Sequence, residues 1–137
     1  MDIKYIITPF IAWFICGGTK FLINCIKERR LAFDLIGYGG MPSNHSAIVS
    51  SMAALIGFTE GIESASFGVA LTLVLIVTMD ANSLRKKVEQ HAIEINKIKN
   101  YQHPILRERI GHSKLEILSG ILLGTVIGYI VFKCSAL

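Results

Sequence analysis

Four long apolar segments, separated by short polar turns, dominate the pattern of the chain. They cover residues 5–26, 47–58, 64–79 and 115–132, and the first of them carries one formal charge, Lys20. A helix needs about 20 apolar residues to cross the hydrocarbon core of a bilayer, so the two shorter middle segments must borrow flanking turns. So few segments cannot close a β-barrel. The pattern therefore predicts an all-α fold, an integral-membrane bundle of about four spanning helices.

One or two amphipathic helices are expected beside these spans. Between residues 84 and 99, apolar side chains recur at helical spacing and charged or polar side chains occupy most other positions. This pattern predicts a helix that lies at the headgroup interface or packs on the base of the bundle. Residues 31–38 are interpreted as a shorter amphipathic or re-entrant piece, and residues 105–110 as a short charged helix or turn.

Small residues in two of the apolar segments predict close helix contacts. Residues 47–58 are rich in Ala, Ser and Gly, and the last apolar segment carries Gly120, Gly124 and Gly128 at intervals of four. This interval places the three glycines on one face of a helix. In lipid, small side chains let helix backbones approach each other, so we expect a close helix contact along this face.

Composition places the chain among membrane proteins. Of its 137 residues, 52% are hydrophobic and 18% charged, and the mean hydropathy is +0.53, too apolar for a small protein in water. This length suits one domain, residues 1–137. The three cysteines have no C-x-x-C spacing and the four histidines none of the spacings of a zinc site, so we expect no metal and no cofactor. We expect the protein to contact the bilayer and not to bind nucleic acid.

The distribution of basic residues predicts the orientation. Eleven of the fourteen Lys and Arg residues lie in two connections, three in residues 27–30 and eight in residues 85–114. The positive-inside rule makes the side that holds these connections cytoplasmic. Four crossings with both termini outside satisfy this rule, and they predict a multi-pass protein of the cytoplasmic membrane.

The turn at residues 39–46, with the sequence G-G-M-P-S-N-H-S, is the first candidate site. Gly40 and its neighbour free the backbone, and Pro42 cannot continue a preceding helix. Ser43 can cap the helix that follows, whose first N–H groups would suit an anion such as phosphate. His45 in the first turn could then reach that anion. The alternative is a capped turn in which His45 is only a polar end residue.

The predicted topology brings this turn to the same membrane face as residues 80–85 and 111–116. Lys20 lies about two turns inside the first span, toward the same face, and a charge at that depth suggests a function or a side chain that snorkels to the interface. Within these segments or directly beside them lie two histidines, two acids and two candidate cations: His45, His112, Asp80, Glu116, Arg85 and Lys86.

His112 and Glu116 are four residues apart, which predicts that both side chains lie on one helical face. A carboxylate there can hold one imidazole nitrogen and leave the other as a nucleophile or base. The alternative is a surface pair worth a few tenths of a kcal/mol.

Three ordered motifs resemble a known family. The sequence P-S-N-H at residues 42–45 is similar to the P-S-G-H motif of the type 2 phosphatidic acid phosphatase superfamily, and H-x-x-x-E at 112–116 is similar to the H-x-x-x-D end of its third motif. Together with D-A-x-x-x-R at 80–85, they resemble the small divergent branch described as related to acid phosphatases and vanadium-dependent haloperoxidases. Asn44 replaces a Gly of the motif, Glu116 replaces an Asp, and Arg107 is one residue later than the motif's Arg.

The resemblance implies a helical membrane phosphatase that works through a phosphohistidine. His112 would be the nucleophile, Glu116 its orienting partner and His45 the general acid. The phosphate would be held by groups from the first span and from the motifs: Ser43, Gly40, Asn44, Lys20, Asp80, Arg85 and Lys86.

These observations favour a lipid phosphate phosphatase at the cytoplasmic face. That side makes phosphatidylglycerophosphate the best guess for the substrate, with phosphatidic acid and polyprenyl diphosphate as alternatives. A catalytically inactive protein that binds anionic lipid or scaffolds a partner through residues 85–99 is a second hypothesis. A small transporter is a third, and it would need several copies; a homo-oligomer stays open.

Overall fold

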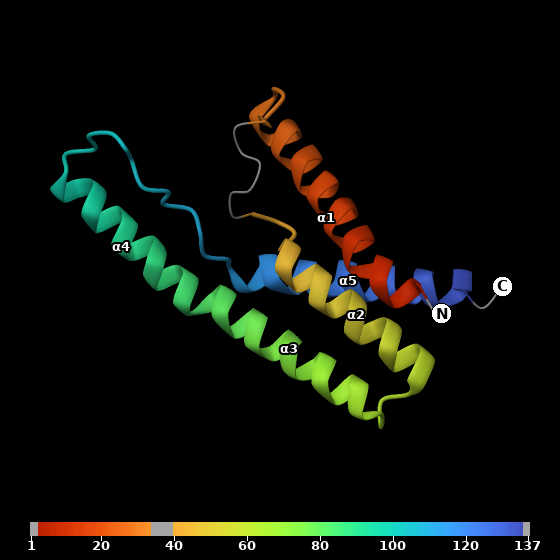
Figure 1. Ribbon diagram of the computed structural model, residues 1–137. Helices are drawn as coiled ribbons and strands as arrows, with labels where there is room; N and C mark the ends of the chain where they lie inside the picture. The colour runs from red at the N-terminus through yellow and green to blue at the C-terminus, as the bar shows by residue number, and fades with distance from the viewer. Residues whose placement is uncertain (1–2, 34–39, 136–137) are drawn as a thin grey trace.

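The computed structural model describes residues 3–33 and 40–135, and in this part of the chain the regular structure is entirely helical. Figure 1 shows the arrangement. The helices are α1 (Lys4–Glu28), α2 (Asn44–Glu60), α3 (Ala65–Asn82), α4 (Leu84–Ile98) and α5 (Lys114–Ser135). The predicted all-α class is confirmed. The predicted piece at 31–38 lies mostly outside the described residues.

Three helical stretches among the described residues are long and apolar enough to cross a membrane: Lys4–Glu28, Ala65–Ile98 and Lys114–Ser135. The remaining predicted span, at residues 47–58, corresponds to α2. This helix has 17 residues and is therefore shorter than a lone span requires, as its sequence indicated. It packs against α1, α3 and α5, so three longer helices surround much of it.

The contact between α2 and α5 follows the predicted glycine face. The two helices run parallel, and Gly120, Gly124 and Gly128 of α5 meet the backbone carbonyls of Ser43, Ala47 and Ser51, in that order. A Cβ at residue 124 would also lie 2.9 Å from the Ala47 Cα, closer than side-chain carbons approach a neighbouring backbone. Both helices thus carry a small residue every four positions, and this match sets their register.

α4 continues α3 as an almost straight helix (Figure 1). Main-chain hydrogen bonds run through Ser83, whose N–H donates to the Met79 carbonyl at 2.9 Å while its carbonyl accepts from the Lys87 N–H at 3.1 Å. α4 therefore projects beyond the bundle in line with α3.

The segment that follows α4 returns along it without forming the expected helix or turn at residues 105–110. Asn96, which is 1% exposed, accepts from the Leu106 N–H and donates to the Leu106 carbonyl, both at 2.8 Å. Glu89 accepts from the N–H groups of Ile110 and Gly111, both at 3.0 Å. The prediction was wrong because side chains of α4 satisfy the backbone groups that a local helix would pair with each other.

Candidate active site

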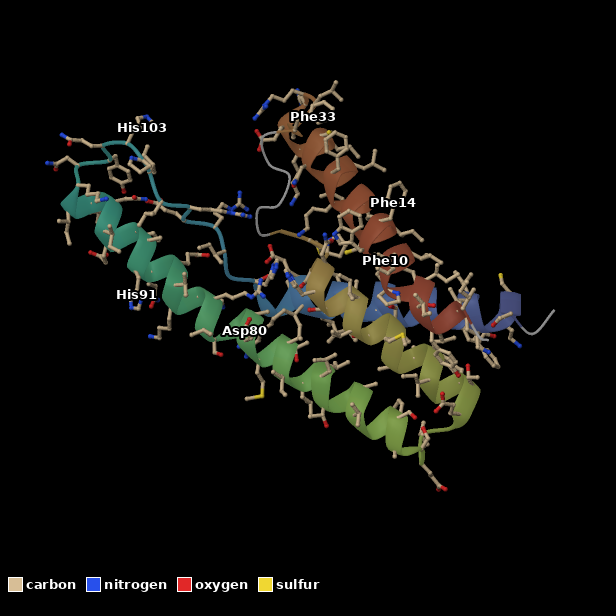
Figure 2. The ribbon with its side chains drawn as sticks, viewed as in Figure 1. Phe10, Phe14, Phe33, Asp80, His91 and His103 are labelled. Carbon is tan, nitrogen blue, oxygen red and sulfur yellow. The ribbon has the colours of Figure 1, made fainter. Side chains whose placement is uncertain are left out.

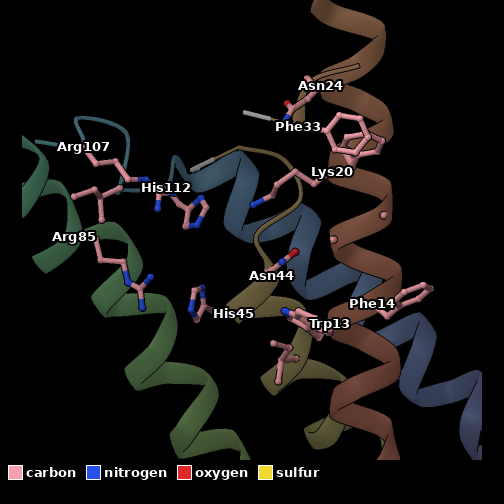
Figure 3. A pocket seen from close by; sticks show the side chains of 16 residues that line it. Trp13, Phe14, Lys20, Asn24, Phe33, Asn44, His45, Arg85, Arg107 and His112 are labelled. Carbon is pink, nitrogen blue, oxygen red and sulfur yellow. The ribbon is translucent and has the colours of Figure 1, made fainter. Parts of the chain in front are cut away.

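Side chains from α1, α2, α4 and the segment after α4 surround a cavity of about 690 Å³, near the start of α2 and α5 (Figure 3). This volume is within the range of small-molecule sites, roughly 300–1,000 Å³. The polar side chains that line it are Lys20, Asn24, Asn44, His45, Arg85, Arg107 and His112. The apolar lining comes largely from aromatic residues of α1 and from Phe33.

His112 is almost fully buried, with 4% of its surface exposed, and it lines this cavity. Its Nδ1 lies 3.3 Å from Oε2 of Glu116, and its main-chain N–H donates to the Ala81 carbonyl at 3.1 Å. When Nδ1–H donates to the carboxylate, Nε2 carries the lone pair. The burial of the ring contradicts the alternative of a surface pair.

His112 and Glu116 do not share a helical face, because α5 begins only at Lys114. Instead, Ser113 and Glu116 form a capping box: the Ser113 N–H donates to Oε2 of Glu116 at 2.9 Å, and the Glu116 N–H donates to the Ser113 hydroxyl at 3.3 Å. The carboxylate that caps the helix is thus also the one that contacts the imidazole. The contact that the sequence predicted is present, but the cap and not the helical repeat produces it.

The pKa of His112 is lowered from its usual value near 6.5. Burial of the ring is the main cause, because it disfavours the imidazolium form. The Glu116 carboxylate opposes this effect, and the positive charges of Lys20 and Arg85 add to it. The ring is therefore neutral at pH 7, the form that a nucleophile requires.

Three cations reach the same cavity from different elements. Lys20 comes from α1 and is 7% exposed, Arg85 comes from the first turn of α4, and Arg107 comes from the segment that returns along α4. The Nε of Arg85 donates to Oδ2 of Asp80 at 2.7 Å, an ion pair that fixes the direction of the guanidinium. Figure 3 shows Lys20 and Arg85 pointing to the space that His45 and His112 also face. Such a set of groups suits an anion with several oxygens.

Four of the residues expected to bind phosphate do not line the cavity. Ser43 caps α2 as predicted, but it is fully buried and its hydroxyl bonds to Ser46. Gly40 is buried as well and has a φ of 145°. Lys86 is exposed and packs against Gly111, and Asp80 reaches the site only through Arg85. The side chains of Ser43, Lys86 and Asp80 do not reach the cavity because they are used in capping, packing and positioning.

Main-chain contacts hold the three motifs together. The Ser43 N–H donates to the Glu116 carbonyl at 3.0 Å, which joins the starts of α2 and α5. Gly111 lies against α4, where a Cβ would come within 3.2 Å of the Lys86 Cα. The thiol of Cys16 on α1 lies 3.8 Å from the Pro42 carbonyl, which it faces as a donor. Segments far apart in the sequence are thus fixed around one space.

The two other histidines, His91 and His103, lie on the exposed outer part of the molecule, away from the cavity (Figure 2). In residues 3–33 and 40–135, no three His, Cys, Asp or Glu side chains are grouped so that they could hold a metal ion.

Sequence reasoning missed the aromatic wall of the cavity and left open which cations reach it. Trp13, Phe14 and Phe21 were interpreted only as part of an apolar span, and in a spanning helix such residues face lipid in most positions. Arg107 was noted as lying one residue after the position of the motif's Arg. The only local signal for it was its place near the motif at 112–116.

Comparison with known proteins identifies the family of the chain. Residues 1–127 match a protein family that is described as the divergent PAP2 family. The uncharacterized membrane protein YuiD of Bacillus subtilis (strain 168) is 29% identical over 133 residues, which cover 80% of this chain and 84% of that protein. No solved structure matches the chain. With its helical membrane architecture and its three motifs around one cavity, the chain belongs to the divergent PAP2 family.

Proposed function

We propose that the protein hydrolyses a lipid phosphomonoester through a phosphohistidine on His112. The observation that carries this proposal is the convergence of two histidines and three cations on one cavity whose remaining lining is largely apolar. A phosphate group suits the charged part of this cavity, and a hydrocarbon chain suits the apolar part. Family membership supports phosphatase chemistry but names no substrate.

The reaction has two steps. In the first, Nε2 of His112 attacks phosphorus, the P–O bond to the lipid breaks, and the imidazolium form of His45 gives its proton to the leaving alkoxide. In the second, water attacks the phosphorus, the P–N bond to His112 breaks, the now neutral His45 accepts a proton from that water, and inorganic phosphate leaves. Lys20, Arg85 and Arg107 balance the charge of the equatorial oxygens in both transition states. Phosphoryl transfer depends mainly on such positioning and charge stabilisation.

The proposed substrate is phosphatidylglycerophosphate, which would be converted to phosphatidylglycerol at the cytoplasmic face. This assignment depends on the positive-inside orientation, and it makes phosphatidic acid and polyprenyl diphosphate the alternatives. The test is phosphate release by the purified protein in detergent, with EDTA present, from each of the three lipids. We expect the highest kcat/KM on phosphatidylglycerophosphate and inhibition by vanadate. Absence of phosphate release from all three lipids would contradict the enzymatic proposal.

An anionic-lipid-binding role without turnover is the second candidate. Lys86, Lys87, Lys97 and Lys99 are exposed on or beside α4, so a basic surface is available to anionic headgroups. This candidate predicts salt-sensitive binding to anionic vesicles and no vanadate-sensitive phosphate release.

Replacing Glu116 with glutamine is expected to shift the acidic limb of the pH–rate profile to lower pH. The nucleophile must be neutral, so activity is lost as pH falls through the pKa of His112, which lies below its usual 6.5. The carboxylate raises this pKa, and removing its charge lowers the pKa further. The amide oxygen still accepts from the Ser113 N–H, so the helix cap is kept.

The measurement is kcat/KM against pH for both proteins on one substrate, because ionisation of the substrate then cancels from the comparison. A shift of the limb to higher pH would contradict the proposed role of Glu116.

Replacing Lys20 with methionine is expected to lower kcat/KM by roughly 10²-fold without unfolding the protein. Lys20 is buried in a spanning helix, where a charge costs up to roughly 3 kcal/mol, so an apolar side chain of similar length should leave Tm unchanged or higher. Lys133→Met, which removes an exposed charge at the far end of α5, is the control and should keep full activity. Unchanged kcat/KM in Lys20→Met would show that Lys20 does not contact the phosphate.

A further inference from the structure

One face of α1 forms a wall of the cavity whose character changes along the helix. Lys20 and Asn24 lie at the end of this wall that carries its polar groups, with Phe21 between them in the sequence. Gly17 and Gly18 follow toward the N-terminus, and Trp13 and Phe14 form the apolar end. The wall thus continues from the cations into the part of α1 that is apolar enough to lie in a bilayer. A ligand that lies along it must be charged at one end and apolar at the other.

The two adjacent glycines have no role in helix packing. A Cβ on Gly18 would meet no atom within 4 Å, and a Cβ on Gly17 would meet only the Asn44 side chain, at an ordinary 3.8 Å. The glycines of α5 differ, because a Cβ on any of them would clash with the α2 backbone. Inside a helix, glycine is the least favourable residue except proline. Neither packing nor helix formation explains the Gly17–Gly18 pair, whereas the space that it leaves open belongs to the cavity.

We infer that Gly17 and Gly18 form the floor of a slot that receives the hydrocarbon chain of the phosphorylated substrate. Gly17 and Gly18 thereby determine substrate specificity, because the slot favours long-chain phosphates over phosphates that lack a chain. This inference rests on the proposed function for the identity of the headgroup. Charge complementarity supports the occupant: the three cations suit an anion, and Trp13 and Phe14, farther toward the N-terminus of α1, offer no charged group to the rest of the ligand.

The first test is a change in substrate selectivity. In Gly18→Leu the new side chain occupies the slot, so the ratio of kcat/KM for dodecyl phosphate to kcat/KM for butyl phosphate should fall at least about 10-fold relative to the wild type. Gly18→Ala should give an intermediate loss. Gly68→Leu is the matched control, since Gly68 is also an exposed helical glycine with nothing within 4 Å of its Cβ position, but lies on α3 outside the cavity.

The second test needs no catalysis. Trp13 is the only tryptophan of the chain and lies at the apolar end of the wall, so a bromine at the end of a bound chain should quench its fluorescence. The probes are 12-bromododecyl phosphate and 12-bromododecanol, with the protein in detergent. We expect half-maximal quenching by the phosphate probe at a concentration at least about 10-fold higher in Gly18→Leu than in the wild type and Gly68→Leu. The alcohol should quench all three proteins weakly and equally.

The outcomes separate the two proposals. Quenching that depends on the phosphate group and is weakened by Gly18→Leu, without any turnover, would support the slot and contradict the phosphatase. Turnover with the same chain-length selectivity in wild type and Gly18→Leu would overturn the slot and leave the phosphatase intact. Quenching that is equal for both probes, or equal in wild type and Gly18→Leu, would also overturn the slot.

Discussion

Replacing His112 with alanine is expected to lower phosphate release by at least about 10³-fold, because the variant lacks the proposed nucleophile. The loss should appear in kcat for every lipid phosphate that the wild type accepts. A second measurement is the trapping of a phosphoenzyme from radiolabelled substrate. The wild type should carry phosphate that is labile in acid and stable in base, as expected for phosphohistidine, and His112→Ala should carry none.

His91→Ala is the matched control for this loss. His91 is exposed on α4 and lies away from the cavity, so its removal should leave kcat/KM within about twofold of the wild type. Comparable activity of His112→Ala and the wild type would show that His112 is not the nucleophile. An acid-stable phosphoenzyme would indicate attack by a hydroxyl group instead.

Replacing Gly124 with alanine is expected to destabilise the bundle by roughly 1–3 kcal/mol, the usual effect of overpacking a close contact. The added methyl group would be forced against the carbonyl, carbonyl carbon and Cα of Ala47, all of them backbone atoms of α2 that no side-chain rotation can move. The helices must therefore separate. Since the Ser43 N–H bonds to the Glu116 carbonyl at the start of the same contact, separation should also disturb the site and lower activity.

Gly68→Ala is the control for helix propensity. Its Cβ position is open, so alanine there should leave stability unchanged or raise it by up to about 1 kcal/mol. The measurement is the Tm of both variants and the wild type in one detergent. An equal or higher Tm for Gly124→Ala would contradict the close contact between α2 and α5.

Helical class, helix positions and the glycine face are predictable from the sequence because each depends on local patterns. Long apolar runs require helices in a bilayer, and the interval of four in Gly120, Gly124 and Gly128 fixes one face whatever that face contacts. Capping by Ser43 is predictable for the same reason, since a cap involves residues only three positions apart. The segment at 105–110 was predicted wrongly because its backbone partners, Asn96 and Glu89, belong to another helix.

The residues around the cavity are predictable only in part. The sequence indicated that His45, His112 and Arg85 would come to one end of the bundle, and all three line the cavity. Their chemical roles remain proposals. Ser43 and Lys86 were expected to bind phosphate but are used in capping and packing, and the aromatic wall of α1 was not foreseen.

By itself, the sequence determined that this is a helical membrane protein with three motifs at one end, because hydropathy and residue spacing are properties of the chain. Only the tertiary structure decided which side chains face the cavity. That choice depends on how each helix is rotated and on its register along its neighbours. Both are set by contacts between distant residues, such as Gly124 with Ala47 and the His112 N–H with the Ala81 carbonyl.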